Sequence, residues 1–251
     1  MGYNPDMLVL SDRQKIILKK LIELYFAEGE EVSSFNFLEN FDLNISPATL
    51  RSEFLELTNK GLLVKTHFAS GRLPTHLALK YYIENLMNYS EEEIDFDEVS
   101  KSFFTSRNEI NILLRKALGF LYKKSKCTAF ITYDFTVQFY RISKLVLCVN
   151  KVYKNRKSQY IGNVCKFFDL IEDYNVLSNY LAANGTDLSF GIKMLNFEDL
   201  GIKYYNHFLC LFSEFKLIGK KGYIGTLGTV DADYRKIVPV VKTLSDILNR
   251  V

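Results

Sequence analysis

Two short polar clusters carry residue types whose spacing suits contact with DNA. They lie in the stretches SPATLRS and ASGRLPT, and their members are Ser46, Thr49, Arg51, Ser52, Ser70, Gly71 and Arg72. Short hydroxyl side chains and arginines are groups that fit between base edges and phosphates. The free backbone N–H groups at the start of a helix add a site for a phosphate. We therefore predict that both clusters contact duplex DNA, with Arg72 at the tip of a ribbon.

The same residues also admit a purely structural interpretation. Ser46 would then be only a helix cap, and Arg51 would pair with an acid such as Glu23 or Glu56. Residues 1–86 carry 9 Lys and Arg against 11 Asp and Glu, so this part of the chain is not basic. Taken alone, the composition leaves DNA contact and protein contact both open.

Other candidate chemistry is weakly supported. His67 and His76 flank the second cluster with no cysteine nearby, so we expect no metal site. No serine, cysteine or carboxylate pair stands in a recognisable catalytic arrangement, so we expect neither an enzyme nor a cofactor. The stretch GKKGYIGTLG has apolar residues between its glycines, which favours a hairpin over a phosphate-binding loop.

The compartment is predicted from what the sequence lacks. The four cysteines are scattered and form no CxxC pair, which fits a reducing cytoplasm. The opening MGYNPDMLVLSDRQ does not resemble a secretory signal, and no run of eighteen apolar residues occurs. We therefore expect a cytoplasmic protein.

The first eighty residues show which elements position the two clusters. Ser11 and Gln14 form a capping box at the start of a first helix, and a second short helix follows Ser33 or Ser34. A third helix over 47–59 begins with a Ser-Pro start and carries an apolar stripe. LLVKTHF and RLPTHLAL then read as two short strands. This order predicts a winged helix-turn-helix domain over 1–87, with the third helix in the major groove.

The remainder predicts a second domain of class α+β. Six carboxylates between Glu91 and Glu98 mark an acidic linker over 88–104, and the second domain occupies 105–251. A long helix over roughly 105–123 comes first, and then TAFITYD, VQFYRI and LVLCVNK are expected as strands. One helix is expected over VCKFFDLIEDYNVLSNYLA. Further strands follow, and TVDADYRKIVPVVKTLSDILN closes the chain as a helix.

The basic charge is concentrated in the middle of the chain. Residues 118–168 carry 10 Lys and Arg against 1 Asp or Glu. Two runs, Lys123–Lys126 and Lys151–Lys157, contribute most of this excess. An ordinary solvated face, a second DNA contact, an acidic partner and an anionic membrane surface all remain possible for these runs.

Several stretches, taken together, resemble one known family. LSDRQKIILKKLIELYF, VSS, SPATLR and KGLLVKTHFASGRLPT are similar to the N-terminal domain of the HrcA heat-inducible transcription repressors of bacteria. SFGIKMLNFED and YIGTLGTVDADYRKIVPVVKTLSDIL resemble the C-terminal end of the same family. The resemblance implies a GAF-like second domain with a mainly antiparallel sheet flanked by helices. It also implies a homodimer that represses chaperone genes from an inverted-repeat operator and is kept active by the GroE chaperonin.

The chain departs from the family pattern in two places. Only about sixteen residues separate LVLCVNK from FFDLIEDY, so the inserted dimerising segment of the family is largely absent. GIKMLNFED stands where many relatives have a glycine-glutamate-asparagine pattern, and no function is carried over to it. The main alternative is a winged-helix interaction or ligand-sensing regulator that does not bind DNA directly.

Overall fold

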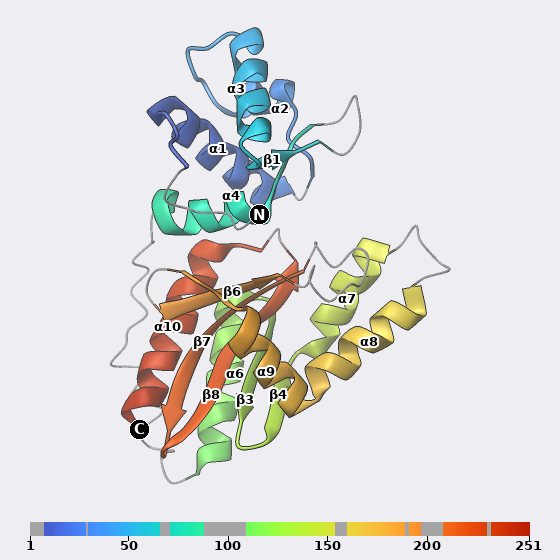
Figure 1. Cartoon of the computed structure of the whole chain (residues 1–251), viewed down its shortest axis with the longest axis vertical. Helices are drawn as coiled ribbons and strands as arrows, with labels where there is room; N and C mark the ends of the chain where they lie inside the picture. The colour runs from blue at the N-terminus through green and yellow to red at the C-terminus, as the bar shows by residue number, and fades with distance from the viewer. Residues whose placement is uncertain are drawn as a thin grey trace. The chain divides into compact units, whose positions relative to one another are not determined.

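The computed structural model divides the chain into two compact units, residues 1–88 and 89–251 (Figure 1). The residues that the structure describes are 8–28, 30–65, 71–87, 109–153, 160–188, 191–196, 208–229 and 232–251. Ser70, His67 and the expected acidic linker lie outside these ranges. Each unit has its own core and is described by itself.

The first unit contains helices and one small antiparallel strand pair. Its elements are α1 (Asp12–Glu28), α2 (Ser34–Asn40), α3 (Pro47–Asn59), β1 (Leu63–Val64), β2 (Leu73–Pro74), α4 (His76–Tyr81) and the π-helix η2 (Tyr82–Leu86). β1 pairs antiparallel with β2. Side chains on α1, α2 and α3 supply much of the core, with Ile17, Phe37 and Leu50 fully buried. The three helices and the strand pair thus follow in the expected order. The second expected strand, RLPTHLAL, is wrong in its second half, because Thr75 caps α4 and His76 begins that helix.

Polar side chains begin four helices of this unit in the same way. In each, a hydroxyl accepts a hydrogen bond from the backbone N–H three residues later, which satisfies a donor that the helix leaves free. The pairs are Ser11 with Gln14, Ser33 with Asn36, Ser46 with Thr49, and Thr75 with Ala78. The Gln14 side chain also accepts from the Ser11 N–H at 3.4 Å, so the predicted capping box is confirmed.

The second unit is built on a six-stranded antiparallel sheet. Its elements are α6 (Ile110–Ser125), β3 (Thr128–Tyr133), β4 (Thr136–Tyr140), α7 (Ile142–Tyr153), α8 (Tyr160–Glu172), α9 (Tyr174–Asn184), β5 (Thr186–Asp187), β6 (Ile192–Asn196), β7 (Phe208–Leu217), β8 (Lys220–Thr229) and α10 (Tyr234–Arg250). The strand order is β4-β3-β8-β7-β6-β5, and every pairing is antiparallel. This confirms the α+β class and the mainly antiparallel sheet.

Helices cover both faces of this sheet. α6 and α10 pack on one face, because α10 contacts β7 and α6 while α6 contacts β3. On the other face, residues of α7, α8 and α9 join the sheet in one cluster that includes Leu145, Phe167, Leu177, Phe130 and Phe212. Side chains alternate between the two faces along each strand.

Two expected elements of the second unit are wrong. LVLCVNK was expected as a strand, but it lies inside α7, where Leu145 is buried while Leu147 is exposed. A short apolar run fits a buried strand and a helix equally well by pattern. The single helix expected over VCKFFDLIEDYNVLSNYLA is two helices, because the Asp173 side chain accepts from the Val176 N–H and caps α9.

The glycine-rich stretch forms a hairpin, as expected. β7 and β8 are joined by the two-residue turn Ile218-Gly219, whose φ values are 48° and 73°. Both central residues of such a turn take the left-handed conformation. Further along β8, Gly222 lies between its sheet partners Tyr133 and Phe215, whose rings stack with centroids 5.9 Å apart.

Candidate nucleic-acid interface

The start of α3 is fixed by its own first turn. The Thr49 N–H donates to Ser46 Oγ at 3.1 Å, and the two hydroxyl oxygens lie 2.9 Å apart. Pro47 occupies the first helical position, where a missing N–H costs nothing. Ser46 is therefore a helix cap, as the structural interpretation requires, yet its side chain remains exposed at the end of the helix.

Arg51 is exposed and makes no ion pair with any residue that the structure describes. The two acids considered as its partners are engaged elsewhere. Glu56 accepts from Gln14 Nε2 at 3.3 Å, and Glu23 accepts from the Tyr82 hydroxyl at 3.4 Å. The pairing alternative is therefore not observed.

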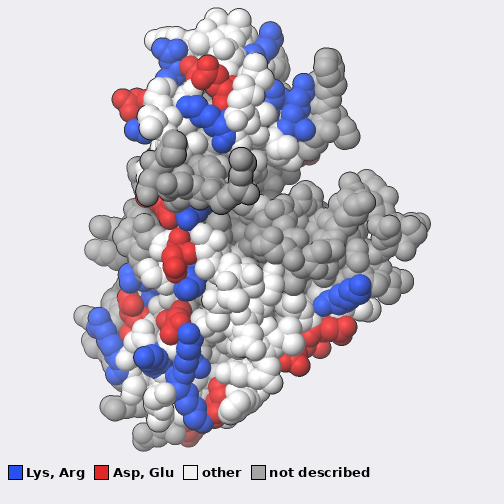
Figure 2. Space-filling view, viewed as in Figure 1, with Lys and Arg blue, Asp and Glu red and all other residues white. Residues whose placement is uncertain are grey.

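The acids of α3 gather on the flank that faces α1. Glu53 Oε1 lies 3.5 Å from Arg13 Nη1, and Glu53 Oε2 accepts from Gln14 Nε2 at 3.2 Å. Lys60 Nζ reaches the same cluster by donating to Gln14 Oε1 at 3.0 Å. Arg51 lies two residues before Glu53, which is about 160° away around the helix. The flank with Arg51 is thus separated from the acids, although Figure 2 shows both signs of charge on this unit.

Gly71 and Arg72 of the second cluster lie directly before β2. The Arg72 N–H donates to the Val32 carbonyl at 2.8 Å, and the Val32 N–H donates back at 3.0 Å. A Cβ added to Gly71 would lie 2.7 Å from the carbonyl carbon and oxygen of Val32. Only glycine fits so close to another backbone, so Gly71 has a structural reason for its identity.

Arg72 does not stand free at a tip, which corrects the expectation from the sequence. Its Nε donates to Thr58 Oγ1 at 3.2 Å and its side chain is partly buried. This contact ties the strand pair to the C-terminal half of α3. Contact of Gly71, Arg72 and Ser70 with DNA stays a prediction.

Thr75, three residues after Arg72, also has a structural role. The Thr75 hydroxyl donates to the Gly61 carbonyl at 2.7 Å and accepts from the Ala78 N–H at 3.2 Å. It thereby joins the end of α3 to the start of α4. Several residues of the two motifs thus hold the unit together. The exposed side chains of Arg51 and Ser52, in contrast, make no hydrogen bond or ion pair with any described residue.

The sequence interpretation missed one exposed apolar residue on α3. Leu55 is 54% exposed and lies one turn beyond both Arg51 and Ser52. An apolar side chain there would suit the methyl group of thymine. The available signal is that Leu55 falls outside the buried stripe of Leu50, Phe54 and Leu57.

The basic run on α6 ends in an exposed group of lysines. Lys123, Lys124 and Lys126 are exposed, and Lys126 takes the left-handed conformation that ends the helix. In the described part of the chain they form no ion pair. Lys154, Arg156 and Lys157 of the second run lie outside the described residues. Membrane contact through either run stays a prediction that lipid flotation would test.

Two other kinds of site are absent from the described ranges. No group of three His, Cys, Asp or Glu residues there is arranged to hold a metal ion. No helix there is long and apolar enough to cross a membrane.

Comparison with known proteins points to one family. The chain is similar to heat-inducible transcription repressors HrcA: it is 34% identical to that of Phytoplasma mali over 145 residues, which are 55% of this chain and 41% of the relative. It is 31% identical to that of Symbiobacterium thermophilum over 129 residues, 49% of this chain and 37% of the relative. It is 31% identical to that of Staphylococcus aureus over 156 residues, 62% of this chain and 42% of the relative. The chain spans about two fifths of the length of these relatives.

Comparison with solved structures gives information on the fold alone. No family model matches the chain. A crystal structure of a hypothetical protein matches with a TM-score of 0.58 and 18% identity, covering 96% of this chain and 99% of the other. The comparisons thus confirm the resemblance to the HrcA repressors that the motifs indicated.

Proposed function

We propose that this HrcA-like chain is a DNA-binding transcriptional repressor of heat-shock genes. The observation that carries the proposal is Arg51 on α3, which is exposed, makes no ion pair among the described residues and lies in the HrcA-like motif SPATLR. An arginine near the start of an exposed helix can reach base edges in a major groove. The first unit, with its helices and strand pair, would act as a winged helix, and the second as a GAF-like domain.

The proposed mechanism is steric. A homodimer would place two copies of α3 in major grooves of an inverted repeat and so block transcription. The two-fold symmetry of the protein would match the symmetry of the operator. Contacts from the start of α3 and from the strand pair would position the protein on phosphates, while Arg51 and Ser52 would read bases.

Modulation by the GroE chaperonin follows from the resemblance. GroE would keep the repressor folded, and heat would divert GroE to other clients, which would relieve repression. Purified protein should then bind DNA more strongly when GroE and ATP are added. Equal binding with and without the chaperonin would remove this part of the proposal.

A gel shift tests DNA binding directly. Purified protein is titrated with duplex that carries the inverted repeat of the family and with a scrambled duplex of equal composition. We expect preference for the repeat, and a slope of log affinity against log salt near about −5 if a dimer neutralises about six phosphates. Equal affinity for both duplexes would refute specific repression.

One pair of variants locates the contact. Arg51→Ala should weaken specific binding by roughly 1–3 kcal/mol, because a base contact is lost. Lys216→Ala is the matched control, since it removes one exposed positive charge from the second unit. If the two variants weaken binding equally, Arg51 contributes charge alone and does not read a base.

The main alternative is a winged-helix module that binds protein. It is favoured by the excess of acids over basic residues in 1–86. Under this alternative, duplex DNA of any sequence would bind weakly and with little effect of Arg51→Ala.

A further inference from the structure

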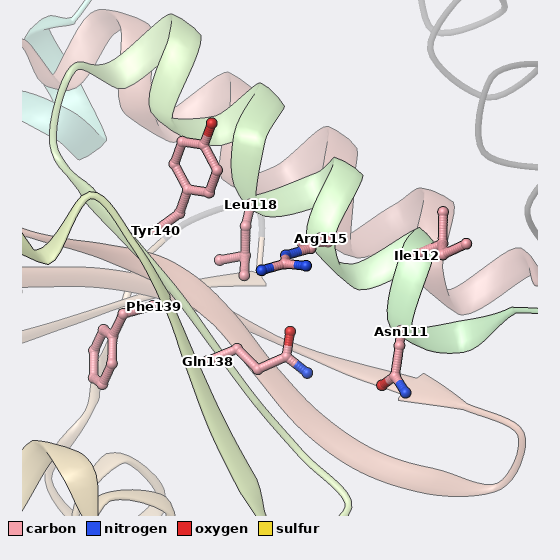
Figure 3. Close-up of a pocket in the computed structure, with 7 residues that line it drawn as sticks. All are labelled: Asn111, Ile112, Arg115, Leu118, Gln138, Phe139 and Tyr140. Carbon is pink, nitrogen blue, oxygen red and sulfur yellow. The ribbon is translucent and has the colours of Figure 1, made fainter.

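A hollow of about 570 Å³ lies between α6 and β4 in the second unit (Figure 3). Its lining comes from both elements and consists of Asn111, Ile112, Arg115, Leu118, Gln138, Phe139 and Tyr140. Leu118 is 1% exposed and gives the hollow an apolar wall. Its volume lies within the range of sites that hold ligands.

Polar side chains enter the hollow from opposite sides. Figure 3 shows Arg115 of α6 and Gln138 of β4 directed into the same space, with Asn111 one turn before Arg115. Within the described part of the chain, none of the three makes a hydrogen bond or an ion pair. Five guanidinium donors and two amide groups are therefore available to a ligand.

The strand on this side of the hollow is the edge of the sheet. β4 stands at one end of the strand order and pairs only with β3. The two strands are joined by the two-residue turn Asp134-Phe135, and Tyr133 pairs with Thr136 next to it. In such a hairpin the residues beside the turn exchange hydrogen bonds, as does every second pair after them.

This register determines which backbone groups of β4 face outward. Thr136, Gln138 and Tyr140 bond to β3, so the N–H and C=O groups of Val137 and Phe139 point away from the sheet. No hydrogen bond to either residue from outside the sheet is present in the described structure. The Phe139 ring is directed away from the other labelled side chains in Figure 3. Phe139 therefore lines the hollow with its backbone and not with its ring.

The two elements that line the hollow carry basic side chains and no acid: residues 110–125 and 136–141 contain Arg115, Lys116, Lys123, Lys124 and Arg141, and the nearest acid along α6 is Glu109, just before the helix. Residues 118–168 contain one acid, Asp134, and it is paired with Lys220. Arg141 lies over the rings of Tyr122 and Tyr140 at 5.7 and 5.9 Å from their centroids, beside the end of β4. An edge-to-edge pair of two copies about β4 would bring two Arg115 side chains together, which like charge disfavours. A negatively charged partner is favoured instead.

We propose that the groove between α6 and β4 binds an extended peptide segment that carries an acidic side chain. The segment would add to the sheet as an antiparallel strand, exchanging hydrogen bonds with Val137 and Phe139. Its acidic residue would lie opposite Gln138, on the face of the sheet that carries α6, and its carboxylate would pair with Arg115. This site lies in the second unit and does not depend on DNA binding.

Fluorescence anisotropy with a designed probe tests the proposal on the full chain. The probe is a fluorescein-labelled peptide of seven residues, alternating valine and threonine, with a glutamate at its centre. A second probe has glutamine at the centre, and a third carries N-methyl groups on the amides that would face β4. Unlabelled glutarate, a small dicarboxylate, serves as a competitor.

We expect saturable binding of the glutamate probe and a loss of about tenfold or more for the glutamine probe. The same loss is expected for Arg115→Gln, while Lys124→Gln, an exposed position on the same helix, should change affinity less than about twofold. The N-methylated probe should lose binding, because it lacks the donors that pair with the strand edge.

Three outcomes would overturn the proposal. Equal binding of the N-methylated probe would mean that no strand is added. Full displacement by glutarate at the concentration of the peptide would assign the groove to a small anion. Absence of saturable binding up to about 1 mM would show that no peptide of this chemistry is recognised. Circular dichroism of Arg115→Gln distinguishes loss of binding from loss of fold.

Discussion

The contacts inside the first compact unit and those inside the second differ in how far apart along the chain their partners lie. In the first unit, helix starts are fixed by hydrogen bonds between residues three apart, such as Ser46 with Thr49. In the second unit, β3 pairs with β8, and the Tyr133 hydroxyl donates to the Leu217 carbonyl across 84 positions of sequence. Local polar contacts thus fix where the helices of the first unit begin, while pairing between distant strands fixes the sheet of the second.

This difference determines how each unit should respond to substitution. A helix cap or a single side-chain hydrogen bond contributes about 1 kcal/mol, whereas a fully buried aromatic side chain contributes several. Single polar substitutions in the first unit should therefore loosen its geometry, and core substitutions in the second should unfold it.

The largest effect is expected from Phe212→Ala. Phe212 is fully buried in β7 and packs edge-on against Tyr223 with ring centroids 5.7 Å apart. Its removal leaves a cavity and should lower the free energy of unfolding by about 3–5 kcal/mol. Urea unfolding followed by circular dichroism measures this, since the chain has no tryptophan. Leu147→Ala, at a position 61% exposed in α7, is the control and should change stability by less than about 0.5 kcal/mol.

Two glycines should respond to the same substitution with opposite sign. Gly71→Ala places a Cβ 2.7 Å from the backbone of Val32 and should destabilise the first unit by about 1–3 kcal/mol. Gly119→Ala places one in ordinary contact, 3.9 Å from the Tyr140 ring. Because Gly119 lies within α6, alanine there should stabilise the helix by about 0.5–1 kcal/mol.

Hydrogen exchange of the amide of Val32 reports on the first of these two variants. This N–H donates to the Arg72 carbonyl, so Gly71→Ala should expose it to exchange. Unchanged protection at Val32 would show that the neighbouring backbone accommodates the methyl group.

The sequence predicted the first three helices of the first unit well because their signals are local. A Ser-Pro start, an apolar stripe and the capping box each report on residues within one or two turns. The placement of Arg72 failed, because its partners Val32 and Thr58 are distant in sequence. A turn signal locates a hairpin, but it does not show which side chain folds back on a neighbouring helix.

The second unit was predicted less completely. The class and the β7–β8 hairpin were evident from pattern, but the apolar run in α7 was taken for a strand. A short apolar run shows no periodicity that would distinguish a helix from a strand. The groove of Arg115 and Gln138 was invisible, because its sides come from separate elements and form no motif.

A smaller effect than that of Phe212→Ala is expected at the contact between the strand pair and α3. Thr58→Val removes the hydroxyl that accepts from Arg72 Nε at 3.2 Å, and Arg72→Met removes the donor while keeping the apolar stem. Each variant should lower the stability of the first unit by about 1 kcal/mol. If the hydrogen bond joins them, the double variant should cost about 1 kcal/mol less than the sum of the two. Additive losses would show that the hydrogen bond between Arg72 and Thr58 does not stabilise the first unit.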